Sequence, residues 1–179
     1  PQISYGEDVM ARVAFALESS DKAHLLETTI VAGIGTLAAE LCRQAEADPS
    51  EIVEVVVVGN TAMHHLFLGL PVRQLGNAPY LAATSDALDV KARDLGLAFA
   101  PGAYVHLLPN IAGFVGADHV ATILSTGLDQ TDETAIVLDI GTNTEIALHH
   151  QGRIITCSTA SGPAFEGAHI SCGMRAAEG

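Results

Sequence analysis

Residues 136–148 combine an acid, a glycine and hydroxyls in a pattern suited to binding a phosphate. An apolar run ends at Asp139, and the apolar pattern resumes at Ile146 after a polar tip of four residues, Gly141, Thr142, Asn143 and Thr144. This pattern predicts a β-hairpin whose small tip lets backbone N–H groups and hydroxyls approach a phosphate closely. The carboxylate of Asp139 is suited to hold Mg²⁺, directly or through water, which makes it the candidate catalytic and metal-binding residue. The alternative is an ordinary hairpin whose polar residues only form the turn.

The residues after this hairpin strengthen the phosphate interpretation. Residues 153–158 are strand-like, and a glycine-containing segment with Gly162 and Gly167 follows them. The order of hairpin, third strand, glycine loop and helix resembles a phosphate-binding half of the actin, sugar-kinase and heat-shock-chaperone ATPase superfamily. That resemblance implies an α/β fold of the ribonuclease-H-like, actin type. It also implies that the hairpin tip, Gly162 and Gly167 contact ATP.

A closer resemblance extends over almost the whole chain. It rests on four blocks in the same order, residues 1–10, 58–67, 108–118 and 162–175. Together they are similar to the C-terminal ATPase domain of the reductive activators of corrinoid proteins. The resemblance implies that ATP and Mg²⁺ drive electron transfer to the cobalt of an inactive cobalamin in a partner methyl-transfer protein. It implies a [2Fe–2S] cluster only in a ferredoxin domain of the full-length protein, outside this chain.

The same resemblance predicts how the chain is divided. Residues 1–127 correspond to the later part of a first ATPase lobe, and residues 128–179 to the opening of a second lobe. The polar, turn-rich residues 127–133 are the expected boundary. We expect the first lobe's own hairpin upstream of Pro1 and the adenosine-binding elements beyond Gly179, so that the 179 residues alone are inactive.

Composition narrows the classes of partner. The chain has 21 acids against 8 Lys and Arg, a formal charge of −13. Such a charge disfavours nucleic acids and anionic membrane surfaces, which require basic faces. No apolar run approaches the roughly 18 residues of a membrane span, and no signal peptide is evident. We therefore expect a cytoplasmic protein.

The cysteines indicate neither a disulfide framework nor a metal cluster. Cys42, Cys157 and Cys172 are widely spaced and odd in number, and the four-cysteine ferredoxin pattern is absent. We expect buried, reduced thiols and a colourless, iron-free protein.

Apolar periodicity predicts α/β architecture. The expected helices cover residues 7–18, a segment capped by Asp21 and ending near Ala47, residues 62–68 capped by Thr61, and residues 113–125. The expected strands cover residues 52–58, as a strand buried on both faces, then residues 88–92 and 104–108.

Several other residues are weaker candidates. His64 and His65 are adjacent in a helix, so they diverge too far to share one metal and are expected to be partly buried or at the surface. The turns at residues 59–61 and 110–113 follow strands, where ligands bind in α/β sheets, but each is equally explained as a simple connection. Glu145 is a candidate to orient water or Mg²⁺, or else a solvated or cross-strand acid. Glu166 either reaches the nucleotide or is a carboxylate at a helix start, and Arg175 either meets a phosphate or ribose or is an ordinary surface residue.

Three functions fit the sequence. The first is an ATPase-coupled activator of a corrinoid protein. The second is a small-molecule kinase of the same superfamily, although no substrate acid or base can be assigned. The third is a non-catalytic module that docks a partner protein.

Overall fold

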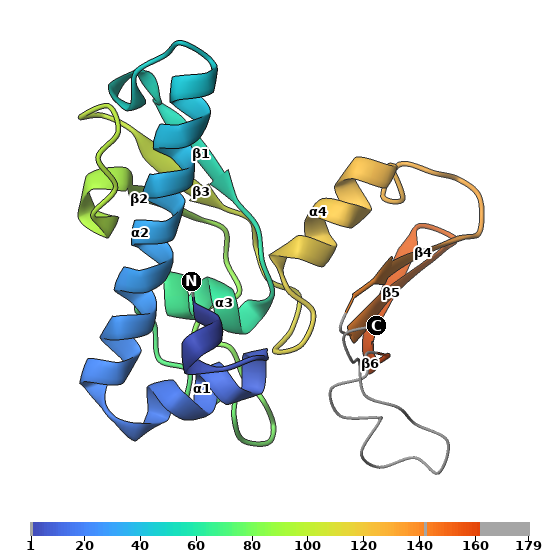
Figure 1. The fold of residues 1–179 in the computed structure, drawn as a ribbon. Coiled ribbons are helices and arrows are strands. Elements are labelled where there is room, and N and C mark those ends of the chain that lie inside the picture. The colour runs from blue at the N-terminus through green and yellow to red at the C-terminus, as the bar shows by residue number, and fades with distance from the viewer. Residues whose placement is uncertain (1, 142, 162–179) are drawn as a thin grey trace, which may run out of the picture. The chain divides into compact units, whose positions relative to one another are not determined.

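The computed structural model describes residues 2–141 and 143–161, and it divides the chain into two compact units (Figure 1). The first unit runs to Ala117, and the second begins at Asp118. Thr142, Gly162 and Gly167 lie outside the described residues, as do Glu166, Cys172 and Arg175. Each unit is described separately below.

The first unit is a helical layer on a small sheet. In chain order, its elements are η1 Gln2–Tyr5, α1 Val9–Glu18, α2 Ser20–Gln44, η2 Pro49–Glu51, β1 Glu54–Val57, α3 Thr61–Phe67, β2 Leu88–Lys91, η3 Ala92–Leu95 and β3 Tyr104–Leu107. The predicted helices and strands are all present. The predicted cap of α2 is wrong, because the side chain of Ser19 accepts the hydrogen bond from the backbone N–H of Lys22, while Asp21 lies in the first helical turn.

The sheet of the first unit has the order β1-β3-β2. β1 pairs with β3 in parallel, and β2 pairs with β3 in the antiparallel direction. Val105 and Leu107 of β3 are fully buried and belong to one core cluster with Val31 of α2 and Phe67 of α3. Figure 1 shows α2 alongside this sheet.

β1 differs from its prediction as a strand buried on both faces. Val55 and Val57 pack into the core, but the side chain of Val56 is 60% exposed. β1 lies at the edge of the sheet, and only one of its faces packs against the buried core cluster. A continuous β-branched run reports high strand propensity, which does not depend on whether the second face is covered.

The loops that follow β1 and β3 pack against each other very closely. The hydroxyl of Thr61 donates to the carbonyl oxygen of Ala112 at 2.6 Å. A Cβ atom on Gly116 would lie 2.5 Å from the Cα atom of Asn60, so only glycine fits there. The cap of α3 is Asn60, whose side chain accepts from the backbone N–H of Met63 at 2.9 Å, and the predicted cap Thr61 is wrong.

The second unit is a helix packed on a three-stranded meander. Its elements are α4 Ala117–Thr126, whose first residue is grouped with the first unit, β4 Ala135–Ile140, β5 Asn143–His150 and β6 Arg153–Ala160. The strands pair antiparallel in the order β4-β5-β6, which confirms the predicted hairpin and third strand. Gln151 and Gly152 both have positive φ, as a two-residue type I′ hairpin turn requires.

α4 begins at Ala117, four residues later than predicted. The segment before it is occupied by a bridge between Ala112 and Val115 and by the close approach of Gly116 to the preceding loop. These contacts keep the backbone out of helical geometry up to Gly116, so the helix begins at Ala117.

The two faces of the second sheet have different surroundings. Ile123 of α4 and the following Leu128 pack against Ala147 on one face. The opposite face carries exposed apolar side chains, namely Ile136, Leu138, Ile140, Leu148 and Ile155. The meander is therefore covered on one side only by the residues that the structure describes.

α2 alone among the described helices is long and apolar enough to cross a membrane by length and composition. Core helices of water-soluble proteins share this property, and α2 buries Leu26, Val31 and Cys42.

The close packing at Gly116 gives a test of this loop arrangement. We expect Gly116→Ala to lower the free energy of unfolding by about 2 kcal/mol or more, because the new Cβ atom must push backbone apart. Gly102→Ala is the matched control, since nothing lies within 4 Å of its Cβ position, and a change within about 0.5 kcal/mol is expected. Chemical denaturation measures both, and equal effects would contradict this loop packing.

Candidate functional site

A row of polar residues crosses the second sheet next to the hairpin tip. Asp139 of β4 pairs directly with Glu145 of β5, which in turn pairs with Ser158 of β6. The Ser158 hydroxyl donates to the Glu145 carboxylate at 3.0 Å, which satisfies one of its oxygens. The strand register thus brings the candidate acid and its neighbour Glu145 to the same face of the sheet.

α4 adds two residues to this row that sequence reasoning missed. The Thr122 hydroxyl lies 3.2 Å from a carboxylate oxygen of Asp139, as a hydrogen-bond donor. Burial is the main cause that raises the pKa of Asp118, and the negative charge of Asp139 raises it further. The available signal was the spacing of Asp118 and Thr122, which puts both on one face of a helix just before the strand.

The hairpin tip is only partly arranged as expected. Gly141 and Asn143 are exposed, but the side chain of Thr144 is buried and its hydroxyl shares a 2.6 Å hydrogen bond with that of Ser161. The backbone N–H of Gly141 donates to the carbonyl oxygen of Asn143 within the turn. A phosphate contact through that N–H therefore requires the turn to open.

The chemistry of these residues fits a hydrated Mg²⁺ carried by a nucleotide. Within residues 2–141 and 143–161, no group of three or more His, Cys, Asp or Glu side chains is arranged to hold a metal by itself. Mg²⁺ on nucleotide phosphates keeps several waters and needs only one or two protein carboxylates. Asp139 supplies one such carboxylate, and Asp118, whose pKa responds to the charge of Asp139, is near enough to supply a second.

The histidine pair of the first unit is more buried than predicted. His64 and His65 of α3 are 3% and 0% exposed. His65 Nδ1 lies 2.7 Å from the Thr61 carbonyl oxygen, and His65 Nε2 accepts from the backbone N–H of Ala83 at 2.9 Å. Both nitrogens of His65 are therefore committed, with the proton on Nδ1.

His64 has the opposite character. Neither of its ring nitrogens has a hydrogen-bond partner among the described residues. Burial lowers its pKa to about 4, and the neighbouring His65 contributes in the same direction. His64 is consequently neutral at pH 7 and unsuited to accept a proton there.

The strand-end turns contain one further buried polar group. The side-chain amide of Asn110 is buried with no partner among the described residues, while its backbone N–H donates to the Ser85 carbonyl oxygen. Asn60, in the neighbouring turn, uses its side chain to cap α3. The structure thus brings these two turns together, and the Thr61 hydroxyl bonds one to the other at Ala112.

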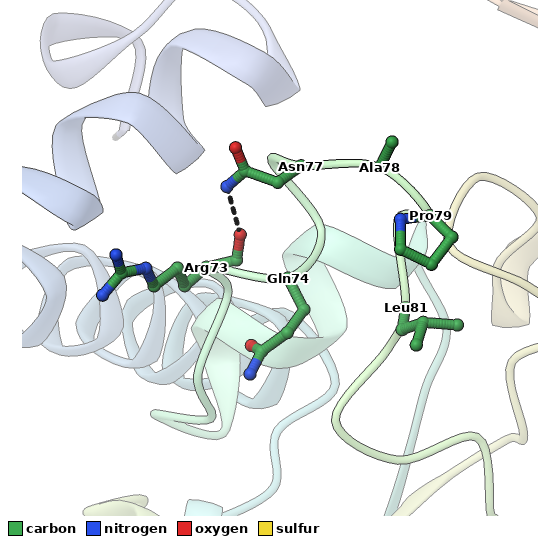
Figure 2. A pocket seen from close by; sticks show the side chains of 6 residues that line it. All are labelled: Arg73, Gln74, Asn77, Ala78, Pro79 and Leu81. Carbon is green, nitrogen blue, oxygen red and sulfur yellow. Dashed lines mark hydrogen bonds between the residues drawn. The ribbon is translucent and has the colours of Figure 1, made fainter.

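A pocket of about 350 Å³ lies in the first unit along residues 73–81 (Figure 2). Its wall consists of Arg73, Gln74, Asn77, Ala78, Pro79 and Leu81. The side-chain amide of Asn77 donates to the Arg73 carbonyl oxygen at 2.9 Å, which shapes one side of the pocket. None of the candidate residues from the sequence lines it.

The described cysteines are free thiols, as predicted. Cys42 is buried, but Cys157 is exposed, so its predicted burial is wrong. Cys157 lies on β6 opposite Ile146, on the sheet face that α4 does not cover. Strand alternation assigns a residue to a face without revealing which face is covered.

Two family models match the chain and meet within it. The model of the RACo middle region matches residues 1–131, and the model of the C-terminal domain of RACo, the ASKHA domain, matches residues 133–179. Their junction lies between α4 and β4.

Curated and solved relatives agree with these matches. The corrinoid activation enzyme RamQ of Eubacterium limosum is 37% identical over 99% of this chain and 30% of its own length. The Co(II) methylated amine-specific corrinoid protein reductase of Methanosarcina barkeri is 31% identical over 97% of this chain and 33% of its own. A solved reductive activator for corrinoid, iron-sulfur protein superposes with a TM-score of 0.86, at 37% identity, over 99% of this chain and 28% of its own. The chain thus spans about a third of the length of these relatives.

The buried, neutral state of His64 predicts a pH dependence of stability. Because its pKa is lowered to about 4 in the folded state, the unfolded chain binds the proton first as the pH falls. The stability that the fold gains from a neutral His64 is therefore fully present above about pH 6.5. As the pH falls towards 4, the free energy of unfolding decreases by about 3 kcal/mol in total.

Replacing His64 isolates this contribution. In His64→Leu, the fall of the unfolding free energy between pH 6.5 and 4 should become smaller. His24→Leu is the control, because the His24 side chain is 71% exposed. If the free energy of unfolding falls with pH equally steeply in the parent and in His64→Leu, the pKa of His64 is not lowered in the folded protein.

Proposed function

The chain belongs to the RACo family, and from that membership we propose that the whole protein is an ATP-dependent reductive activator of a corrinoid methyl-transfer protein. The observation that supports this proposal most strongly is that both family models match, in sequence order, over nearly the entire chain. Two relatives are named for action on corrinoids or corrinoid proteins, which supports the same class of partner.

ATP binding is the second part of the proposal. The actin-like ATPase fold of the matched domain supports it, as does the hairpin that opens residues 133–179. We assign nucleotide contacts to Gly141, Thr142, Asn143, Thr144, Gly162 and Gly167. The assignment of residues 1–127 and 128–179 to two lobes of one ATPase domain likewise stays a proposal.

Asp139 is the proposed metal-binding and catalytic acid. Mg²⁺, when bound with ATP, supplies charge neutralisation at the transferred phosphate. The chain's own residues supply the carboxylate and hold its orientation, through the sheet register and the hydroxyl of Thr122. The electron for the cobalt comes from a [2Fe–2S] cluster that we place in another part of the full-length protein, in the cytoplasm.

The direct test uses the full-length protein. The oxidised, Co(II) form of the corrinoid protein is mixed with the activator and an external reductant, with and without Mg·ATP, and the cobalt oxidation state is followed optically. One electron per cobalt should convert Co(II) to Co(I) only when Mg·ATP is present. Reduction that proceeds equally without nucleotide would remove ATP from the proposed function.

Asp139→Ala in the same protein tests the acid. We expect the rate of ATP-dependent cobalt reduction to fall by about 10²–10³, with a smaller loss of Mg·ATP affinity of about tenfold, because the carboxylate contacts the bound Mg²⁺ but acts most strongly on charge that develops in the reaction. Asp129→Ala is the control, since Asp129 is an exposed acid in the turn after α4. An Asp139→Ala rate equal to that of the control would leave Asp139 as a turn residue only.

A further inference from the structure

One hydrogen bond connects the two regions that the family models separate. Thr122 of α4 lies within residues 1–131, the middle-region match, and Asp139 of β4 lies within residues 133–179, the ASKHA match. Both belong to the same compact unit, which begins at Asp118. α4, at the end of the middle-region match, therefore packs against the sheet formed by residues of the ASKHA match.

We propose that Thr122 is a positioning residue for Asp139, and that α4 thereby couples the middle region to the nucleotide site. This inference rests on the proposed role of Asp139 in binding Mg·ATP. Thr122 acts through Asp139 and needs no contact with the nucleotide.

The hydroxyl of Thr122 has two acceptors within reach. It lies 3.1 Å from the carbonyl oxygen of Asp118, one helical turn earlier, and 3.2 Å from the Asp139 carboxylate. It carries a single hydrogen, and an ionised acceptor forms the stronger bond. Donation to Asp139 is therefore favoured whenever that carboxylate is charged.

Asp139 depends on this donor because its other neighbours repel it. Thr122 is the one described residue that donates to the Asp139 carboxylate. Glu145 lies directly across the strand pair, and the charge of Asp139 acts on Asp118. Without the hydroxyl, the Asp139 side chain would turn away from these two acids and lose the orientation that the sheet gives it.

The packing of α4 on the sheet gives the donor a defined position. Ile123, the neighbour of Thr122, is buried and packs with Leu128 against Ala147 of β5. The geometry of the bond therefore changes only if α4 moves on the sheet or Asp139 turns. Either event transmits the state of the nucleotide site to α4, or the position of α4 to the nucleotide site.

The test compares three variants of the full-length protein. Thr122→Val removes the hydroxyl and keeps the β-branched shape, whereas Thr122→Ser keeps the hydroxyl. Thr126→Val is the matched control, because the Thr126 hydroxyl bonds only to backbone carbonyls of its own helix. The probes are ATP with Mg²⁺ and ATP with a chelator, and the readout is the dissociation constant.

We expect Thr122→Val to weaken binding of Mg·ATP by about tenfold, the loss of one charge-assisted hydrogen bond, and to leave metal-free ATP binding unchanged. Thr122→Ser and Thr126→Val should match the parent. In hydrogen exchange, Mg·ATP should slow the amides of α4 in the parent and in Thr126→Val, but less in Thr122→Val.

The outcomes separate this inference from the proposed function. If the parent binds Mg·ATP and Thr122→Val binds it within twofold, the positioning role is wrong and the ATPase proposal stands. An equal loss in Thr122→Ser and Thr122→Val would show a packing effect and also overturn the positioning role. If the parent itself binds no Mg·ATP, both proposals fail.

Discussion

The path of the first unit depends on the backbone contact between the loops that follow β1 and β3. Gly116 lies so close to Asn60 that no side chain fits between them, and the hydroxyl of Thr61 closes the contact by donating to Ala112. These loops follow the carboxyl ends of two parallel strands, so their separation is set by strand pairing. α4 begins at Ala117, directly after Gly116, and α3 begins at Thr61, whose hydroxyl takes part in the contact, so both helix starts are tied to it.

α4 continues from that contact into a different environment. It leaves the loop at Ala117 and packs Ile123 onto the second sheet, although its sequence belongs to the region matched by the middle-region model. The compact units and the family regions are thus divided at different points of the chain. The hydrogen bond from Thr122 to Asp139 thus joins residues of both family regions within one compact unit, which is the geometric basis of the coupling that we propose.

Local patterns allowed much of the fold to be predicted from the sequence. The alternation around Gly141 predicted the hairpin, and Gly152 marks the type I′ turn that joins it to β6. Interactions between distant residues could not be predicted in this way. Thr122 and Asp139 are 17 residues apart, and only the packing of α4 brings them together. Ser19 and Asp21 are both good capping residues, so the choice between them depended on where the backbone becomes helical.

Burial was harder to predict than secondary structure. Val56 and Cys157 are of residue types that are common in protein cores, but they lie on sheet faces that the described residues leave uncovered. His64 and His65 were expected to be partly buried or at the surface, yet tertiary packing buries both almost completely. The secondary-structure propensity of a residue predicts the local backbone conformation, whereas its burial depends on which neighbouring layer packs against it.

The uncovered face of the second sheet bears on how the protein is handled in the laboratory. Ile136, Leu148 and Ile155 form a row across the three strands on that face, and apolar strand surfaces in water promote self-association. A version limited to the described residues would expose this surface and would tend to self-associate during purification. Light scattering should therefore accompany each preparation of the protein for biophysical work.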